Sequence, residues 1–129
     1  MLLSTPSLDL SHRGLSLNAA YGLAATVYLS DDLRELILLD NPLTDAGVAA
    51  IGMALAAKPR PMLTSLVLGS TGAGERTARV VEGLITSNPT LTKINLSRNP
   101  NLDADARAWL TQAVEQRERS GAPKLMLIC

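Results

Sequence analysis

Residues 69–77 have the composition of a phosphate-binding loop. Gly69 and Gly74 match the glycines of the pattern G-x-x-x-x-G-K-[ST], and the segment is expected to leave a strand and open a helix, where backbone N–H groups can hold a phosphate. The lysine position, however, holds Glu75, whose charge would repel a phosphate, and Thr77 comes one residue late. We therefore favour a glycine-rich turn between a strand and a helix, and we expect no nucleotide or other cofactor.

The single histidine, His12, is a second candidate for chemistry because it follows Ser11 directly. A Ser–His–acid nucleophile needs a buried carboxylate that orients the imidazole, and Asp9 is the one candidate nearby in the sequence. A histidine in a surface turn is the interpretation that we favour.

Metal ligands are sparse in this sequence. One histidine and one cysteine, Cys129 at the last position, give a low density of the ligands that zinc prefers. The acidic pairs Asp31-Asp32 and Asp103-x-Asp105 lack the spacing of a calcium loop and are typical of helix ends. We expect no metal site, no catalytic residue and no enzymatic activity.

The composition narrows the class of protein further. The 129 residues suffice for one domain, predicted to span 1–129, and the 12 Lys and Arg balance the 12 Asp and Glu. This neutral balance gives no sign of a nucleic-acid partner or an anionic membrane surface. One cysteine cannot form an internal disulfide, and neither a signal peptide nor an apolar run of about 20 residues is present. An intracellular, reducing, cytoplasmic location is expected.

A Leu-x-Leu pattern repeats along the whole chain. Its copies begin at positions 8, 36, 66, 94 and 125, and this regular spacing is that of a repeat protein. Such repeats predict a solenoid with an aliphatic core, which suits a chain without phenylalanine. The predicted units lie near 5–32, 33–62, 63–90 and 91–121, and a terminal strand covers 122–129. The Leu-x-Leu pairs are Leu8 and Leu10, Leu36 and Leu38, Leu66 and Leu68, Ile94 and Leu96, and Leu125 and Leu127.

A polar turn follows each Leu-x-Leu pair. Asn41 and Asn99 stand where a side-chain amide can satisfy backbone groups left unpaired at a strand exit, whereas the first and third units have Arg13 and Thr71 there. The pattern resembles the L-x-x-L-x-L-x-x-N-x-L sequence of leucine-rich-repeat proteins, and the period near 28 resembles their ribonuclease-inhibitor-like subclass. The resemblance implies an α/β solenoid, a right-handed horseshoe arc with strands on the concave side and helices on the convex side.

Apolar residues at helical spacing follow each turn. In the second unit, Asp45 is expected to cap a helix that buries Val48, Ile51 and Leu55. Together with the strands, this pattern predicts about five short parallel strands and four helices. The other inward stripes are Ala20, Leu23, Ala24 and Val27; Val80, Val81 and Leu84; and Ala106, Trp109, Leu110, Ala113 and Val114.

Alternation along the strands predicts which residues face the concave side. Ile37, Leu39, Val67 and Met126 are apolar where water is expected, and charged residues surround them, which suits a partner protein. The alternative is a face covered by the chain's own termini or by a second copy. The predicted partner-binding residues are Asp9, Glu35, Ile37, Leu39, Val67, Lys93, Asn95, Lys124 and Met126.

The C-terminal end of the chain offers two further surfaces. Residues 125–129 form a predicted edge strand that could pair with another chain in a homodimer or a larger assembly. A long helix over 103–120 carries a run of charges that we interpret as a solvated face, made of Glu115, Arg117, Glu118 and Arg119.

A non-catalytic protein-protein interaction scaffold is the function that these features favour. Similar repeats occur in ribonuclease inhibitor, in nucleotide-oligomerisation-type receptors and in the actin-binding domain of tropomodulin, and a shared fold does not fix the function. Two alternatives are a small-GTPase regulator, resembling the leucine-rich-repeat GTPase-activating protein for Ran, and a structural subunit of a larger assembly.

Overall fold

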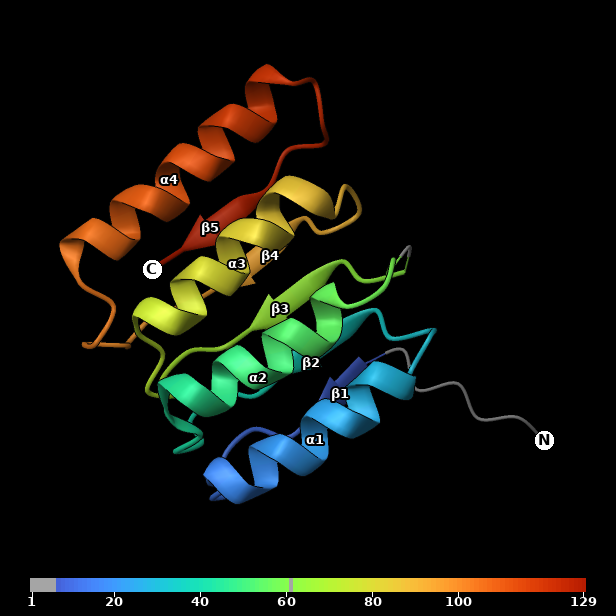
Figure 1. The fold of residues 1–129 in the computed structure, drawn as a ribbon, viewed down its shortest axis with the longest axis vertical. Helices are drawn as coiled ribbons and strands as arrows, with labels where there is room; N and C mark the ends of the chain where they lie inside the picture. The colour runs from blue at the N-terminus through green and yellow to red at the C-terminus, as the bar shows by residue number, and fades with distance from the viewer. Residues whose placement is uncertain (1–6, 61) are drawn as a thin grey trace.

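The computed structural model describes residues 7–60 and 62–129, so the start of the first predicted unit, near residue 5, lies outside the described residues. Five short strands alternate with four helices along the chain (Figure 1). The strands are β1 (Ser7–Asp9), β2 (Glu35–Ile37), β3 (Ser65–Val67), β4 (Lys93–Asn95) and β5 (Met126–Ile128). The helices are α1 (Leu17–Leu29), α2 (Thr44–Ala56), α3 (Glu75–Ser87) and α4 (Ala104–Arg119).

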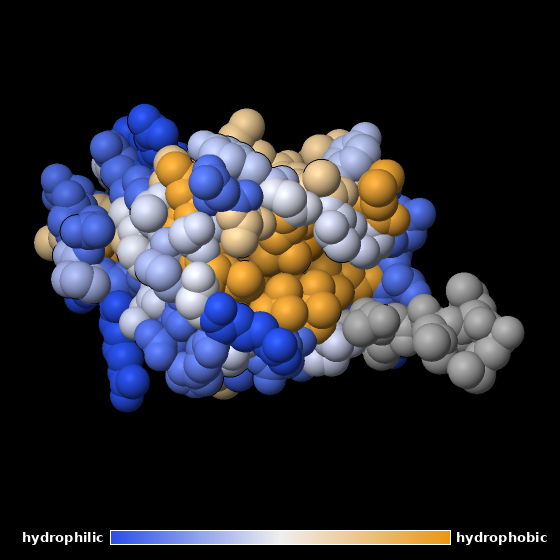
Figure 2. Space-filling view, turned by 90° about the horizontal axis from the view of Figure 1, so that it is seen from below, coloured by the Kyte–Doolittle hydropathy of each residue, from blue (hydrophilic) through white to orange (hydrophobic). Residues whose placement is uncertain are grey.

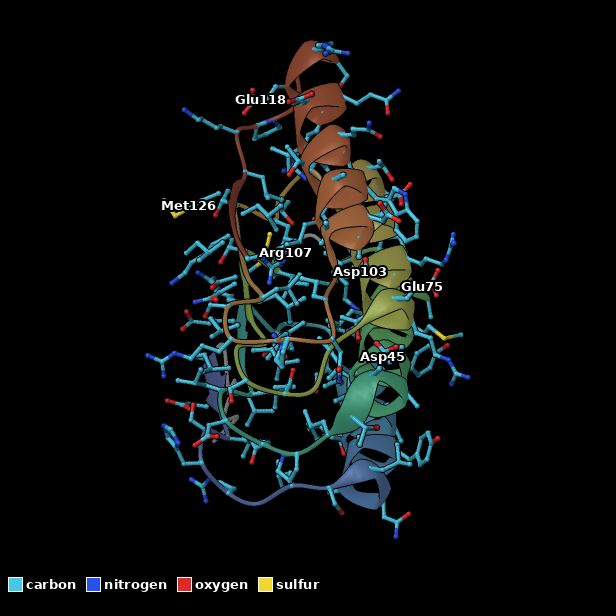
Figure 3. The ribbon with its side chains drawn as sticks, turned by 90° about the vertical axis from the view of Figure 1, so that its left-hand side faces the viewer. Asp45, Glu75, Asp103, Arg107, Glu118 and Met126 are labelled. Carbon is cyan, nitrogen blue, oxygen red and sulfur yellow. The ribbon has the colours of Figure 1, made fainter. Side chains whose placement is uncertain are left out.

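The strands form one parallel sheet in the order β1-β2-β3-β4-β5. Each helix packs against the next one in the chain, and Figure 3 shows the helices together on one side of the sheet, so that no helix of residues 7–60 and 62–129 lies on its other face. The α/β fold with five parallel strands and four helices is therefore confirmed. In the described part of the chain, no helix is both long enough and apolar enough to cross a membrane.

The core is a continuous aliphatic layer between the sheet and the helices. Leu36, Leu66 and Ile94 stand in register on neighbouring strands and are buried, as are Leu33, Leu63 and Leu91 just before those strands. The predicted helical stripes point into this layer. Their buried members are Ala20, Val27, Val48, Ile51, Leu55, Val81, Leu84, Ala106, Leu110 and Ala113.

The first unit has an apolar side that no described unit covers. Figure 2 views the molecule from the end formed by α1 and β1 and shows a hydrophobic area there between polar rims. Leu8, Leu10, Leu15 and Leu23 of this unit are only partly buried. The inner units bury the same positions because each has a neighbour on both sides.

The predicted strand-exit asparagines hold consecutive units together. The Asn99 amide nitrogen donates to the carbonyl oxygens of Leu68, Leu96 and Ser97 at 2.9–3.2 Å. Its Oδ1 accepts hydrogen bonds from the N–H groups of residues 71–73, all at 3.0 Å. Asn41 does the same two units earlier, where it joins the turn after Leu10 to the turn after Leu38. Both side chains are 1% exposed.

Thr71 occupies the asparagine position of the third unit and performs part of that role. Its hydroxyl is buried and donates to the carbonyl of Leu68 at 2.8 Å, while its own carbonyl accepts from the N–H of Thr44 at 3.0 Å. Arg13, at the same position of the first unit, is exposed. The two departures from the repeat pattern therefore differ, because the Thr71 side chain is buried and bonded at the strand exit, whereas the Arg13 side chain is exposed.

The last strand lies two residues later than its repeat pattern predicts, because Leu127, and not Leu125, stands opposite Ile94. Helix α4 has 16 residues where the other helices have 13, and the turn that follows it passes through Gly121 in a left-handed conformation. These extra residues delay β5, and Leu125 is buried just before the strand.

Replacing Asn99 by alanine is expected to lower the free energy of unfolding by about 3 kcal/mol, because buried donors and acceptors in two units lose their partner. Urea denaturation followed by circular dichroism measures the change. The exposed Asn101, replaced in the same way, is the matched control and should change stability by about 0.5 kcal/mol or less. Equal effects of the two substitutions would contradict the proposed role of Asn99.

Candidate functional site

Most of the residues predicted to bind a partner lie in two rows on the helix-free face of the sheet. Strand register aligns Glu35, Ser65, Lys93 and Met126 in the first row. The second row consists of Asp9, Ile37, Val67, Asn95 and Ile128. The sequence therefore predicted which side of strands β1 to β4 faces away from the helices.

The apolar part of this face is more covered than predicted. Val67 is only 8% exposed, because it lies on the middle strand with Ile37 and Asn95 on either side. Leu39 is half-buried and leans over Gly69, where an added Cβ would stand 2.8 Å from a Leu39 methyl group. The expectation that Val67 meets water is therefore wrong.

The exposed apolar residues of this face gather on β5. Met126 is 60% exposed and Ile128 is 37% exposed. Figure 3 shows Met126 pointing away from the helices. Strand register places them beside Lys93 and Asn95, whereas the two-residue delay of β5 leaves Lys124 exposed before the strand and outside the rows.

The polar residues on β1, β2 and β4 of this face are held by local hydrogen bonds. Glu35 accepts from the Ser7 hydroxyl at 3.0 Å. Asp9 accepts from the hydroxyl and the N–H of Ser11, at 2.6 and 3.0 Å, and these two bonds lower the pKa of its carboxyl. Asn95 accepts from the N–H of Ser97 in the same way at 2.9 Å.

Ser65 lies between Glu35 and Lys93 in the centre of the face. Its hydroxyl oxygen is buried and has no hydrogen-bond partner, the one such side-chain atom within residues 7–60 and 62–129. Buried polar groups are nearly always satisfied by protein or by ordered water, so this hydroxyl is an exception.

Ser11, His12 and Asp9 do not form a catalytic chain. The Ser11 hydroxyl donates to Asp9, whereas the His12 ring contacts Asp40 of the next turn, with 2.8 Å between Nδ1 and Oδ2. More than half of each of the last two side chains is exposed, so no buried carboxylate orients the imidazole. His12 is therefore the surface turn residue that we expected.

The helix end that resembles a phosphate loop is occupied by a carboxylate of the chain itself. Asp45 accepts from the N–H groups of Gly74, Arg76 and Thr77 at 2.7–3.0 Å and from the Thr77 hydroxyl at 2.8 Å. Figure 3 labels Asp45 in the row of helix N-termini, with Glu75 and Asp103 on the following helices. The carboxylate takes the place that an anionic ligand would need.

Asp45 was expected to cap its own helix, and this expectation is wrong. Helix α2 begins at Thr44, whose own hydroxyl accepts from the N–H of Gly47 at 3.4 Å. The carboxylate of Asp45 instead caps α3 in the next unit. Partial burial disfavours ionisation of Asp45. The hydrogen bonds from Thr77, Gly74 and Arg76 outweigh that effect and hold the pKa of the carboxyl below its ordinary value. By contrast, Asp103 caps its own helix α4 through the N–H of Ala106.

Comparison with known proteins finds a solved structure with a similar fold but identifies no family for this chain. A scan against protein-family models and a search of curated proteins both find no match. The solved structure of a tropomodulin C-terminal domain from Caenorhabditis elegans is similar, with a TM-score of 0.64 and 19% sequence identity. The similarity covers 89% of this chain and 66% of that one, so the chain spans slightly less than two thirds of the tropomodulin domain. At this identity the likeness concerns the fold alone.

This comparison corrects the ribonuclease-inhibitor-like assignment. The similar structure has a leucine-rich-repeat-like fold but belongs to a different family, and no family model supports the predicted subclass. The period of a strand–helix unit is set by the lengths of one strand, one helix and two turns. Different families built from such units can therefore share a similar period.

Two buried arginines hold the other end of the helices, and the sequence analysis missed both. Arg117 is 4% exposed, and its guanidinium donates to the carbonyls of Ile85, Asn88, Pro89, Leu91 and Pro123 at 2.6–3.2 Å. Arg60 is 5% exposed and donates to carbonyls at the ends of α1 and α2. Burial lowers the pKa of both guanidinium groups.

The interpretation of Arg117 as part of a solvated charge run is wrong. Arg117 continues the buried stripe of Leu110 and Ala113 at helical spacing, which was the available signal. Its neighbours Glu115, Glu118 and Arg119 are exposed as expected. Arg60 gave no such signal, because it lies in an irregular segment between Pro59 and β3.

Replacing Asp45 by asparagine is expected to lower the free energy of unfolding by about 2 kcal/mol at neutral pH, because the amide loses charge-assisted hydrogen bonds to α3. The pKa of Asp45 is lowered by folding, so its contribution is complete above the ordinary value of 3.8 and is lost as the pH falls through the folded pKa. Urea titrations of wild type and variant should therefore converge below that value. The exposed Asp105, changed to asparagine, is the control, and a pH-independent difference for Asp45→Asn would contradict this assignment.

Replacing Arg117 by leucine is expected to cost about 3 kcal/mol or more, since several buried carbonyls lose their donor. Arg119→Leu is the matched control, because the Arg119 side chain is 78% exposed and should contribute about 0.5 kcal/mol or less. Thermal and urea unfolding of both variants test this difference. Similar stability of the two variants would show that the buried guanidinium is dispensable.

Proposed function

We propose that this chain is a non-catalytic module that binds another protein through the helix-free face of its sheet, which the sequence predicts to be concave. The observation that carries the proposal is the exposed apolar pair of Met126 and Ile128 next to Lys93 and Asn95. Apolar residues within a polar rim are typical of protein interfaces, and methionine adapts readily to a partner surface.

The distribution of charge along the face gives such a partner an orientation. Asp9 and Glu35 lie on β1 and β2, whereas Lys93 lies on β4 and Lys124 just before β5. A partner with a basic region facing β1 and β2 and an acidic region facing β4 and β5 would complement this arrangement. Complementary charges of this kind contribute mainly to association rate and specificity.

A structural role in a larger assembly is the second candidate, and the open edge of β5 favours it. Strand β5 is the last of the sheet and pairs with β4 on one side only among the described strands. An unpaired edge can accept a strand of another chain. Regulation of a small GTPase stays a prediction from the sequence, with stimulation of GTP hydrolysis as its test.

Met126→Asp is expected to weaken binding of the partner tenfold or more without unfolding the protein, because it places a charge in the exposed apolar area. The measurement is affinity purification from the native source at moderate salt, with mass spectrometry of the bound proteins. Val67→Asp is unsuitable, since it would bury an unpaired charge.

Met53→Asp is the matched control for this experiment. Met53 is 62% exposed, close to the value for Met126, but it lies on α2 in the helix layer. Loss of a partner from Met126→Asp alone supports the proposed face. Partners that stay bound to a folded Met126→Asp variant contradict it, and a concentration-dependent dimer in sedimentation would favour the β5 edge.

A further inference from the structure

A groove of about 470 Å³ lies between the C-terminal ends of α2 and α3. Its apolar walls come from Leu55, Ala56 and Ala57 on one side and from Leu84 and Pro89 on the other. This volume lies within the range of about 300–1,000 Å³ that small-ligand sites occupy. The groove belongs to the helix layer, so it is separate from the helix-free face and independent of the function proposed for that face.

The same place between the other helices is filled by an arginine. Between α1 and α2, Arg60 donates to the carbonyls of Tyr28, Ser30 and Ala54. Between α3 and α4, Arg117 donates to carbonyls at the end of α3 and in the segment leading to β4. In both places a buried guanidinium satisfies carbonyls that have no donor within their own helix.

Asn88 occupies the corresponding position between α2 and α3. Asn88 lies three residues before Leu91, just as Arg60 lies three residues before Leu63. Asn88 is also as far from the N-cap of α3, Gly74, as Arg117 is from the N-cap of α4, Asp103. The Asn88 side chain is used locally, where its Oδ1 accepts from the N–H and the hydroxyl of Thr90. An asparagine is too short to reach α2, and the groove lies where the longer side chain would be.

The two cations that line the groove, Lys58 and Arg60, both have partners within this chain. The Lys58 amine lies 2.8 Å from Asp31 and 4.7 Å from the centre of the Tyr28 ring, both of the first unit. The Arg60 guanidinium is engaged by the carbonyls of Tyr28 and Ser30 near α1 and by those of Ala54 and Leu55 at the end of α2. The groove is thus left with apolar walls and the negative ends of two helix dipoles, and the carbonyls of Ala56 and Ala57 have no donor within α2.

We infer that this groove binds an arginine side chain of a partner protein. The methylene stem would pack between Leu55 and Leu84, and the guanidinium would donate to the carbonyls of Ala56 and Ala57 at the end of α2. Arg60 makes the same kind of contact with the carbonyls of Ala54 and Leu55, and Arg117 does so at the end of α3. Arginine suits this environment better than lysine, because its planar group offers five donors and is more weakly hydrated than an ammonium.

N-acetyl-L-arginine amide is a direct probe of the groove. Titration into the ¹⁵N-labelled protein should shift the amide resonances of residues 55–60 and 84–91, with a dissociation constant on the order of millimolar for a single side chain. The matched probes are N-acetyl-L-citrulline amide, which has nearly the same shape without the charge, and N-acetyl-L-lysine amide. Both should bind more weakly than the arginine probe.

A pair of charge variants at Ala57 makes the test specific to the groove. Ala57 is exposed at the end of α2 and tolerates either charge, so Ala57→Glu should tighten binding of the arginine probe and Ala57→Lys should weaken it, each by about threefold. The same two substitutions at the exposed Ala25 on α1 are the controls and should change nothing. The spectra report at the same time that each variant is folded.

Two outcomes would overturn the inference. Citrulline and arginine probes that bind equally would show that the guanidinium charge is not recognised. Shifts outside the groove, or an affinity that does not respond to the charge at residue 57, would place any binding elsewhere. Neither outcome bears on the sheet face, because Met126→Asp tests that surface separately.

Discussion

Backbone groups at the ends of very short elements must find hydrogen-bond partners, and this requirement governs the structure. Strands of three residues and helices of 13 to 16 leave many N–H and carbonyl groups without a partner in their own element. Side chains of neighbouring units supply those partners: asparagines at the strand exits, Asp45 at the start of α3, and Arg60 and Arg117 at the helix ends. Burial of leucine holds the layers together, whereas these polar contacts fix the position of each unit on the next.

The two surfaces of interest follow from this arrangement. Regular stacking aligns side chains in rows on the helix-free face, where the middle strand is covered by its neighbours and the last strand is open. Regular stacking also places equivalent sites between successive helices. One of these sites lacks its arginine and is therefore a groove, so a departure from the repeat, rather than the repeat itself, marks the proposed binding place.

The fold could be predicted from the sequence because leucine periodicity reports burial directly. The strands β1 to β4, the helical stripes and the roles of Asn41 and Asn99 were predicted correctly. The contacts of Asp45 and Arg60 could not be predicted, because they depend on which residues of another unit come within reach. The burial of Val67 and the delay of β5 were missed for the same reason. The burial of Val67 depends on coverage by the neighbouring strands, and the delay of β5 depends on the length of α4 and of the turn after it. A local sequence pattern reports neither. The family assignment failed because period alone does not separate families with similar units.

The cap of α3 has a consequence for the modular character of the chain. Asp45 serves the helix of the following unit, whereas Asp103 already serves its own helix. Removal of residues 63–90 as one block would preserve the alternation of strand and helix but would bring Asp45 against the start of α4. Two carboxylates would then compete for one helix end, with repulsion between them. The units are thus alike in backbone but not interchangeable in charge, and a deletion at this junction would leave one helix end with two carboxylates.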